Sequence, residues 1–545
     1  MFKTQINYIK LILLSLILFP IIIANSQTIY KYRVDLTDKN NSPYNIYNPS
    51  EFLSPKAIER RLNQGIEITE QDIPVNKNYL LQLISKGVNI QNYSRWFNSV
   101  VVFTQDSSLK DTLLKLPFVE NISLIAKTEK IKSSINIKIN IDTASMGKSY
   151  NQLNIIELDE LHKKGFMGEN IDIAIIDAGF LNVNETLSLK HLFDNNKILG
   201  TKDFVDLNND IYKESVHGLA VFTVLGSYMP NKIIGSAPNA NYWLLRSENE
   251  FYEQIEEEEN WIAAVEFADS VGADIISSSL GYTTFDIASQ NHTYQDLDGK
   301  TTRISISADI AFEKGMIVVN SVGNSGNKDW KYLGAPADAK NIIAVGSVNS
   351  DREISDFSSF GPTSDNRIKP DVLAMGDNTA YYNYNDEIKF TGGTSMSAPL
   401  ISGAIACLWQ ALPLMSNKEI IDLTKQSTHL FNNPNNHEGY GIPNFYKAYL
   451  TQLNYTFNNL ESNDFEIYPN PFFEKIEIYY KADEYKNIEI CIFDVYGKYI
   501  LSENIVLSNS TLSKFSINTS SLNNGVYILR IFDGENYYKK KIIKI

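Results

Sequence analysis

The chain contains little cysteine and is short of positive charge. Only Cys407 and Cys491 occur in its 545 residues, so buried apolar cores, and not a disulfide framework, must hold the fold together. Cys407 lies in an apolar helical pattern and is expected to be a core residue, not a thiol nucleophile. Lys and Arg total 49 against 64 Asp and Glu, which gives a net charge of -15 at pH 7. That charge repels a phosphate backbone and argues against nucleic acid as a partner.

The N-terminal apolar run is too short for a membrane span. Leu11–Ile23 has about two-thirds of the roughly 20 residues that a helix needs to cross a bilayer. Two lysines precede the run, and Ala24 and Ser26 follow it in the small-x-small pattern that a signal peptidase reads. We therefore expect residues 1–26 to be a cleaved signal peptide, with a membrane anchor as the alternative. No cysteine follows the run directly, so the usual site of lipid attachment is missing.

The rest of the chain is apolar enough to form several folded domains. Hydrophobic residues make up 43% and aromatic residues 12% of the sequence, which is too much for a mainly disordered protein. At about 150 residues per domain, the length suggests three or four units. The expected divisions are a signal peptide (1–26), an N-terminal domain with a cleavable linker (27–140), a central domain (141–450), a linker (451–464) and a C-terminal domain (465–545).

The two outer domains have different patterns. In the N-terminal domain, Ile29–Val34 and Ser99–Phe103 suit strands, whereas Ser54–Asn63 and Asn78–Lys86 suit helices, which predicts an α+β domain. A polar, exposed linker follows it. The C-terminal domain instead alternates apolar and polar residues between turn signals and has no convincing helix, which predicts a small antiparallel β-sandwich.

The central domain is expected to be α/β with a central parallel sheet between two layers of helices. Short runs such as Ile171–Ile176 and Met316–Val319 are apolar at nearly every position and alternate with helical stretches. Strands that are apolar on both faces are typical of parallel sheets covered by helices.

A serine in a glycine-rich turn is the first candidate catalytic residue. Ser395 follows Gly392-Gly393-Thr394 and begins an apolar helical pattern. A serine where a tight turn enters a helix presents its hydroxyl to solvent, and its N–H points, with the positive helix end, toward any nearby anion. This placement suits a nucleophile whose intermediate carries an oxyanion. The alternative is an ordinary helix N-cap.

Among six histidines, His217 has the setting of a general base. It opens the apolar helical run Leu219–Leu225 and is followed by Gly218, which leaves room for a substrate. His162 precedes two lysines and is expected at a solvated helix end. The other four lie in polar or loop-like surroundings: His191, His292, His429 and His437.

Two polar residues follow apolar strands, where open α/β sheets place their sites. Asp177 ends Ile171–Ile176 and is costly to bury unpaired, so it suits the role of orienting the base and stabilising an imidazolium. Asn324 lies in the glycine-bounded loop after Met316–Val319 and is expected to present an amide donor. The alternative for both is an ordinary cap or turn residue.

In residue type, order and local context these four positions resemble the subtilisin-like serine peptidases, or subtilases. The matching strings are Ile176-Asp177-Ala178-Gly179, His217-Gly218, Gly323-Asn324-Ser325-Gly326 and Gly393-Thr394-Ser395-Met396-Ser397-Ala398-Pro399. The resemblance implies hydrolysis of polypeptides through an Asp/His/Ser triad and an acyl-enzyme, with Asn324 binding the oxyanion and no cofactor in catalysis. It also implies that Ser279-Leu280-Gly281 pairs with the substrate backbone as an added strand.

The outer domains extend the resemblance. Residues 27–132 resemble a subtilase propeptide, which covers the cleft until it is removed; the alternative is an accessory domain that stays attached. Ile467–Pro471, Asp494–Lys498 and Asn524–Tyr527 resemble the sorting domain of the type IX secretion system, which implies contact with outer-membrane secretion machinery. The basic end, Lys539–Lys544, otherwise suits a lysine-protected edge strand.

Two acidic segments carry weaker predictions. The run Glu256–Glu259 is expected to be a solvated helix face. Many subtilases bind structural calcium, and Asp296-Leu297-Asp298-Gly299 suggests such a site, although it lacks a specific ligand spacing.

Two other functions stay open at this point. Leu219 and Phe222 replace the Thr and Ala usual in subtilases near the histidine, and Leu400-Ile401 replaces a common His-Val, so an inactive binding protein on the same scaffold is one alternative. An esterase or lipase is the other, although the order Asp, His, Ser argues against the α/β-hydrolase plan. The sequence does not reveal the substrate preference or the oligomeric state.

Overall fold

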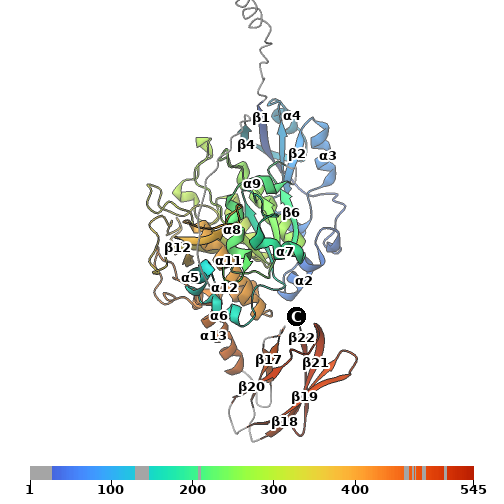
Figure 1. The fold of residues 1–545 in the computed structure, drawn as a ribbon. Helices are drawn as coiled ribbons and strands as arrows, with labels where there is room; N and C mark the ends of the chain where they lie inside the picture. Colours follow the sequence, from blue (N-terminus) through green and yellow to red (C-terminus); the bar gives the residue numbers. More distant parts are fainter. Residues whose placement is uncertain are drawn as a thin grey trace, which may run out of the picture.

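Three folded parts follow one another along the chain in the computed structural model (Figure 1). The residues described are 28–128, 147–206, 210–458 and, apart from 469, 471, 473, 482–485 and 508–511, 465–544. The predicted signal peptide (1–26) and most of the predicted cleavable linker (129–146) lie outside these residues. Within them, no helix is long and apolar enough to cross a membrane.

The N-terminal domain is α+β, as predicted. Its antiparallel sheet has the strand order β2-β3-β1-β4, and the N-cap Ser54 accepts a hydrogen bond from the Ala57 N–H at the start of the first helix. Buried apolar side chains of the sheet and helices form one core. The elements are β1 (Ile29–Leu36), α2 (Pro55–Asn63), α3 (Lys77–Ser85), β2 (Asn89–Ser94), β3 (Ser99–Thr104), α4 (Leu109–Leu113) and β4 (Val119–Thr128).

The central domain contains the predicted parallel sheet, with seven strands in the order β13-β12-β11-β10-β5-β9-β6. All residues of its middle strands β5, β10 and β11 are buried, because both faces of the sheet are covered. The strands are β5 (Asp172–Asp177), β6 (Ile198–Asp203), β9 (Asn241–Arg246), β10 (Ile275–Ser278), β11 (Ile317–Ser321), β12 (Ile343–Val348) and β13 (Val372–Met375).

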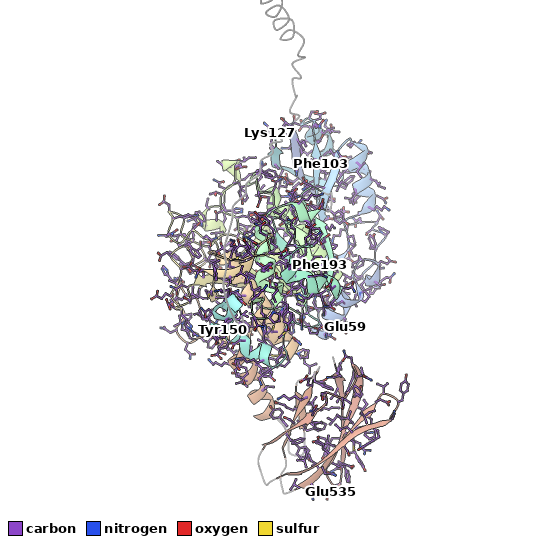
Figure 2. All side chains as sticks on the ribbon, in the orientation of Figure 1. Glu59, Phe103, Lys127, Tyr150, Phe193 and Glu535 are labelled. Atoms are coloured by element: carbon purple, nitrogen blue, oxygen red, sulfur yellow. The ribbon has the colours of Figure 1, made fainter. Side chains whose placement is uncertain are left out.

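Two helical layers cover the sheet, and alternate residues of each strand face opposite layers. Ile173 and Ile175 pack with helices α8 (His217–Gly226) and α11 (Thr394–Ala411). Ala174 and Ile176 pack on the other side with α9 (Glu256–Val271) and α10 (Arg303–Glu313). Figure 2 shows side chains filling the space between these layers. Cys407 is buried in α11, as expected of a core residue.

The N-terminal domain covers α9, so the prediction of a solvated acidic face on Glu256–Glu259 is wrong. All four glutamates are buried. Glu256 pairs with Lys31, and Glu259 pairs with Arg33 at 3.0 Å; both cations belong to the N-terminal domain. Glu258 accepts a hydrogen bond from His292 at 2.6 Å. The run looked solvated in the sequence because its cations come from segments distant along the chain.

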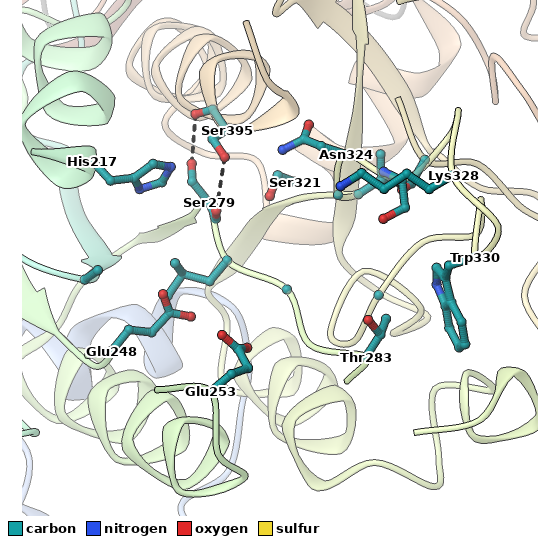
Figure 3. A pocket seen from close by; sticks show the side chains of 18 of the residues that line it. His217, Glu248, Glu253, Ser279, Thr283, Ser321, Asn324, Lys328, Trp330 and Ser395 are labelled. Atoms are coloured by element: carbon teal, nitrogen blue, oxygen red, sulfur yellow. Dashed lines mark hydrogen bonds between the residues drawn. The ribbon is translucent and has the colours of Figure 1, made fainter. Parts of the chain in front are cut away.

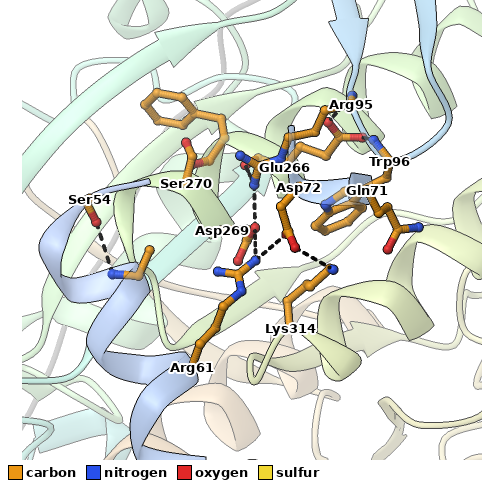
Figure 4. A network of polar contacts seen from close by, with 12 residues as sticks. Ser54, Arg61, Gln71, Asp72, Arg95, Trp96, Glu266, Asp269, Ser270 and Lys314 are labelled. Carbon is orange, nitrogen blue, oxygen red and sulfur yellow. Dashed lines mark hydrogen bonds and ion pairs between the residues drawn. The ribbon is translucent and has the colours of Figure 1, made fainter. Parts of the chain in front are cut away.

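Further along α9, one buried carboxylate contacts three guanidinium groups, and Figure 4 shows two of them, those of Arg61 and Arg95. Asp269 is fully buried and pairs with Arg60, Arg61 and Arg95, all from the N-terminal domain. Arg61 also bonds Asp72 at 2.7 Å. Because an unpaired buried charge is costly, these contacts make the docking of the N-terminal domain specific in position.

The C-terminal domain has two antiparallel sheets around one apolar core, as predicted. Helix α13 (Phe445–Asn458) leads toward it, so helical structure continues into the segment expected to be a linker. β22 is an edge strand and carries the C-terminal lysines. The sheets contain β16 (Phe465–Tyr468), β17 (Lys475–Lys481) and β20 (Leu512–Asn518), and β18 (Lys486–Asp494), β19 (Tyr499–Leu507), β21 (Gly525–Phe532) and β22 (Tyr537–Lys544).

Candidate active site

The predicted site residues meet at the carboxyl edge of the central sheet. Asp177 ends β5, Ser279 follows β10, Asn324 follows β11, and Ser395 lies in the first turn of α11. A cleft of about 440 Å³ brings His217, Ser279, Asn324 and Ser395 to one surface (Figure 3). Parallel strands end at the same edge, which is why segments far apart in the sequence converge here.

His217 and Asp177 form a direct hydrogen bond. Nδ1 of His217 lies 2.8 Å from Oδ1 of Asp177, and the same oxygen accepts the Ala178 N–H at 2.8 Å. The aspartate side chain is fully buried, whereas the histidine is about one-third exposed to the cleft. A carboxylate at Nδ1 favours the tautomer with a proton on that nitrogen, which leaves Nε2 free to accept one.

Gly218 allows this pair to form. A Cβ at that position would lie 2.1 Å from the Gly179 carbonyl oxygen and 3.1 Å from the Asp177 Cβ. Helix α8 therefore approaches the end of β5 more closely than any larger residue would permit. The Ser215 Oγ accepts the His217 N–H at 3.0 Å and fixes the start of the helix.

Negative charge around His217 favours its protonated form. Burial alone lowers the pKa of the imidazole, but the charge and hydrogen bond of Asp177, with smaller contributions from Glu248 and Glu250, raise that pKa to about 9. A histidine acting as a base must be neutral, so its active fraction increases as the pH rises toward that value.

The hydroxyl of Ser395 is bonded to a backbone carbonyl. Its Oγ donates to the Ser279 carbonyl oxygen at 3.3 Å, and the Ser279 hydroxyl donates back to the Ser395 carbonyl at 2.9 Å (Figure 3). His217 faces the same space across the cleft. A long or misdirected bond at the nucleophile is common without substrate, so a turn of the hydroxyl toward His217 is compatible with catalysis.

The amide of Asn324 is held so that its nitrogen faces the cleft. Its Oδ1 accepts the Thr394 N–H at 2.9 Å and the Thr394 hydroxyl at 3.1 Å. With the oxygen engaged, Nδ2 points toward Ser395 in Figure 3. A donor beside the Ser395 N–H at the start of a helix suits a developing oxyanion.

The segment predicted to bind substrate runs along the floor of the cleft. Ser279, Leu280 and Gly281 all line it. Asn320 donates to the Leu280 carbonyl at 2.9 Å in the middle of the segment, and Tyr282, which follows the segment, exchanges two backbone hydrogen bonds with Ala335. These bonds anchor the segment to neighbouring parts of the central domain.

Acidic residues of the cleft were missed in the sequence. Glu248, Glu250 and Glu253 line the same cleft as Ser395. They belong to the loop after β9, and no motif marks them. Glu248 accepts the Tyr282 hydroxyl at 2.5 Å, which positions its carboxylate.

His162 is not at a solvated helix end, so that prediction is wrong. The side chain is buried within the central domain, and its Nε2 lies 3.0 Å from the Ser236 carbonyl oxygen. Burial lowers its pKa to about 4, so it is a neutral core residue. The two lysines that follow it misled the prediction, because only they face solvent.

The calcium prediction gains no support. Oδ1 of Asp298 accepts the N–H groups of Lys300 and Thr301 at 2.7 and 2.8 Å, and Asp296 accepts that of Thr293, so both carboxylates are bonded to backbone N–H groups of their own loop. Across the described part of the chain, no cluster of three or more His, Cys, Asp or Glu is arranged to hold a metal ion.

Comparison with protein families gives three matches along the chain. Residues 168–441 match the Subtilase family, residues 31–140 match the peptidase S8 propeptide domain of Bacteroidota, and residues 466–545 match a secretion system C-terminal sorting domain. The predicted resemblances of all three parts are thereby confirmed.

Individual relatives match the central part. The chain is 26% identical to subtilisin DY of Bacillus licheniformis over 285 residues, which are 51% of this chain and 90% of that protein. It is 30% identical to the major intracellular serine protease of Bacillus subtilis (strain 168) over 270 residues, 47% of this chain and 73% of the relative. It is 27% identical to subtilisin E of the same strain over 283 residues, 51% of this chain and 65% of the relative.

Proposed function

The chain belongs to the subtilase family, and we propose that it is a secreted serine endopeptidase whose triad is Asp177, His217 and Ser395. The 2.8 Å contact between His217 and the buried Asp177, across the cleft from Ser395, supports this assignment most directly. Asn324 is proposed as the oxyanion donor, and no cofactor takes part in the chemistry.

The proposed reaction is acyl transfer. A peptide lies beside Ser279–Gly281 as an added strand, and the Ser395 Oγ attacks its carbonyl carbon while Nε2 of His217 takes the hydroxyl proton. The Asn324 amide and the Ser395 N–H bind the oxyanion of the tetrahedral intermediate. His217 then gives the proton to the leaving amine, and Asp177 stabilises the imidazolium in the interval. Water, deprotonated by the same base, releases the acyl group from the serine.

Loss of the Asn324 amide should lower kcat and leave KM nearly unchanged. We expect Asn324→Ala and Asn324→Asp each to reduce kcat by about 10²–10³-fold, a magnitude established for subtilisin itself. The aspartate keeps an acceptor for both Thr394 bonds but replaces the donor in the cleft by a negative oxygen. Steady-state kinetics on a peptide substrate measure the effect. Near-normal kcat in Asn324→Asp would mean that Asn324 only supports Thr394.

We also propose that the N-terminal domain is the enzyme's own inhibitor. Its last strand ends beside the cleft: the Lys127 N–H donates to the Gln254 side chain at 2.8 Å, and the Gln290 amide donates to the Leu124 and Ile125 carbonyls at 3.3 Å. Cleavage in the linker after this strand is then the activating step.

Asp269→Asn should weaken retention of the cleaved N-terminal domain. The substitution leaves buried guanidinium groups of Arg60, Arg61 and Arg95 without their shared anion, so we expect the dissociation constant of the domain to rise about 10²–10³-fold. Recovery of activity after dilution of the processed enzyme measures it. The exposed Asp329→Asn serves as control and should behave as wild type. Equal recovery in all three proteins would contradict an inhibitory role for this contact.

In this proposal, the segments at the two ends of the chain direct its export. Residues 1–26 direct passage to the periplasm, and residues 465–545 address the protein to outer-membrane secretion machinery, so the mature enzyme is secreted or held at the cell surface. The proposed divisions between them are 27–140 for the propeptide and its linker, 141–450 for the peptidase and 451–464 for the connection to the sorting domain.

A single time course tests the proposed function. Purified full-length protein is followed on gels with casein and, separately, with a small ester. Loss of the N-terminal domain together with casein cleavage supports the zymogen peptidase. Ester hydrolysis without casein cleavage would favour an esterase, and absence of both, even after removal of residues 27–140, would favour an inactive binding protein.

A further inference from the structure

One side of the cleft carries a concentration of negative charge. Glu248, Glu250 and Glu253 line the cleft that contains Ser395, and Asp286 lines an adjoining hollow that also includes Glu253. We call these four residues the acidic rim. Figure 3 shows Glu248 and Glu253 on one side of the segment that begins at Ser279.

The acidic rim lacks internal counter-charges. Among the described residues no Lys, Arg or His lies within ion-pair distance of its four carboxylates, although the nearby Glu256, Glu258 and Glu259 are all paired with cations. Glu248 is oriented by the Tyr282 hydroxyl at 2.5 Å, and Asp286 accepts the Glu253 N–H at 3.1 Å. Two of the four carboxylates, those of Glu248 and Asp286, are thus held in place by neutral donors and not by cations.

Burial and mutual repulsion oppose the charged state of the rim. Burial, together with Asp286 and Glu258, raises the pKa of Glu253 to about 7. Burial also raises the pKa of Glu248 well above its ordinary value, with Glu253 and Asp177 adding to the shift. A cation bound at the rim would offset both the burial and the mutual repulsion of the carboxylates, because it stabilises their ionised form.

A substrate strand would direct specific side chains toward this rim. A peptide bound along Ser279–Gly281 points successive side chains to opposite sides. If the residue before the scissile bond faces the wall that contains Lys328 and Trp330, the second and fourth residues face the other side, where Figure 3 places Glu248 and Glu253. Glu248 contributes to the electrostatics of His217 and so adjoins the second residue, whereas Glu253 lines the hollow beside Gly281 and Thr283, further from Ser395.

We propose that the acidic rim makes this enzyme select polypeptides with a lysine or arginine at the second or fourth residue before the scissile bond. The inference rests on the proposed peptidase function and adds its substrate class.

Paired peptides test the inference on the mature enzyme. Chromogenic peptides that differ only by lysine or the neutral isostere norleucine are compared at each of the four residues before the scissile bond. We expect kcat/KM to favour lysine about tenfold or more at the second or fourth residue. No gain is expected at the first residue, since Lys328 lies on that side of the cleft.

Charge-removing variants identify the source of the preference. Glu248→Gln should reduce the lysine-to-norleucine ratio of kcat/KM at the second residue to about one. Glu253→Gln should do the same at the fourth residue. The exposed Glu313→Gln should leave both ratios unchanged. The ratio cancels any effect of Glu248 on His217, and cleavage of norleucine peptides shows that each variant is folded. Equal cleavage of both peptides by wild type, or a preference for lysine that survives both rim variants, would overturn this inference but not the proposed peptidase function. Failure of wild type to cleave any peptide contradicts the peptidase function instead.

Discussion

Ser395→Ala should lower kcat by about 10⁶-fold and leave the N-terminal domain attached to the full-length chain. The size of this loss is the one known for subtilisin. Without Oγ the acyl-enzyme cannot form, so both cleavage of added peptides and removal of the enzyme's own propeptide stop. The Ser395 hydroxyl lies at the start of α11, donates to the Ser279 carbonyl and lines the same cleft as His217.

A neighbouring serine supplies the control for this variant. Ser397 lies two positions further in α11, is buried, and donates to the Ala374 carbonyl at 3.1 Å. Ser397→Ala removes one hydrogen bond and should cost about 1 kcal/mol of folding stability without stopping maturation. Measuring kcat and propeptide removal in both variants separates the chemistry from helix packing. A Ser395→Ala protein that still matures when purified alone would refute the assignment of the nucleophile.

Asp177→Asn should lower kcat by about 10⁴-fold with little change in the fold. The amide matches the carboxylate in shape, and the site is fully buried, but the amide is neutral and cannot stabilise the imidazolium that forms when His217 takes the proton of Ser395. Steady-state kinetics measure the loss. Asp172 lies at the other end of the same strand, far from the cleft, so Asp172→Asn should keep kcat near wild type.

The pH profile of the same variant gives an independent check. In the wild type, kcat/KM should rise with pH as His217 loses its proton through a pKa of about 9. Asp177→Asn removes the main group that raises this pKa, so burial dominates and the inflection should move to lower pH. An unchanged inflection would mean that the titrating group is not His217.

The proximity of the candidate site residues was predictable because each has a local signal in the sequence. Asp177 ends an apolar strand, Asn324 lies in a glycine-bounded loop, and Ser395 follows a glycine turn. The parallel sheet then brings these strand ends to one edge, so their proximity follows from the fold class. The α/β assignment was equally accessible, because buried strands such as β5 are apolar at nearly every position.

Residues whose surroundings come from distant segments were not predictable. Glu256 and Glu259 are buried because the N-terminal domain supplies Lys31 and Arg33, and nothing in the local sequence shows this cover. His162 is buried by contact with the Ser236 carbonyl in another part of the central domain. The acidic rim likewise forms from irregular loops, whose positions depend on tertiary packing.

Covalent labelling tests the central assignment most directly. The matured enzyme is treated with a serine-directed fluorophosphonate, and the modified residue is located by mass spectrometry of its peptides. We expect one adduct, on the Ser395 hydroxyl, that is absent from Ser395→Ala and forms far more slowly in His217→Ala, with residues 27–140 removed from both variants because neither can mature by itself. An adduct on another serine, or none in a folded and matured wild type, would contradict a nucleophile at Ser395 activated by His217.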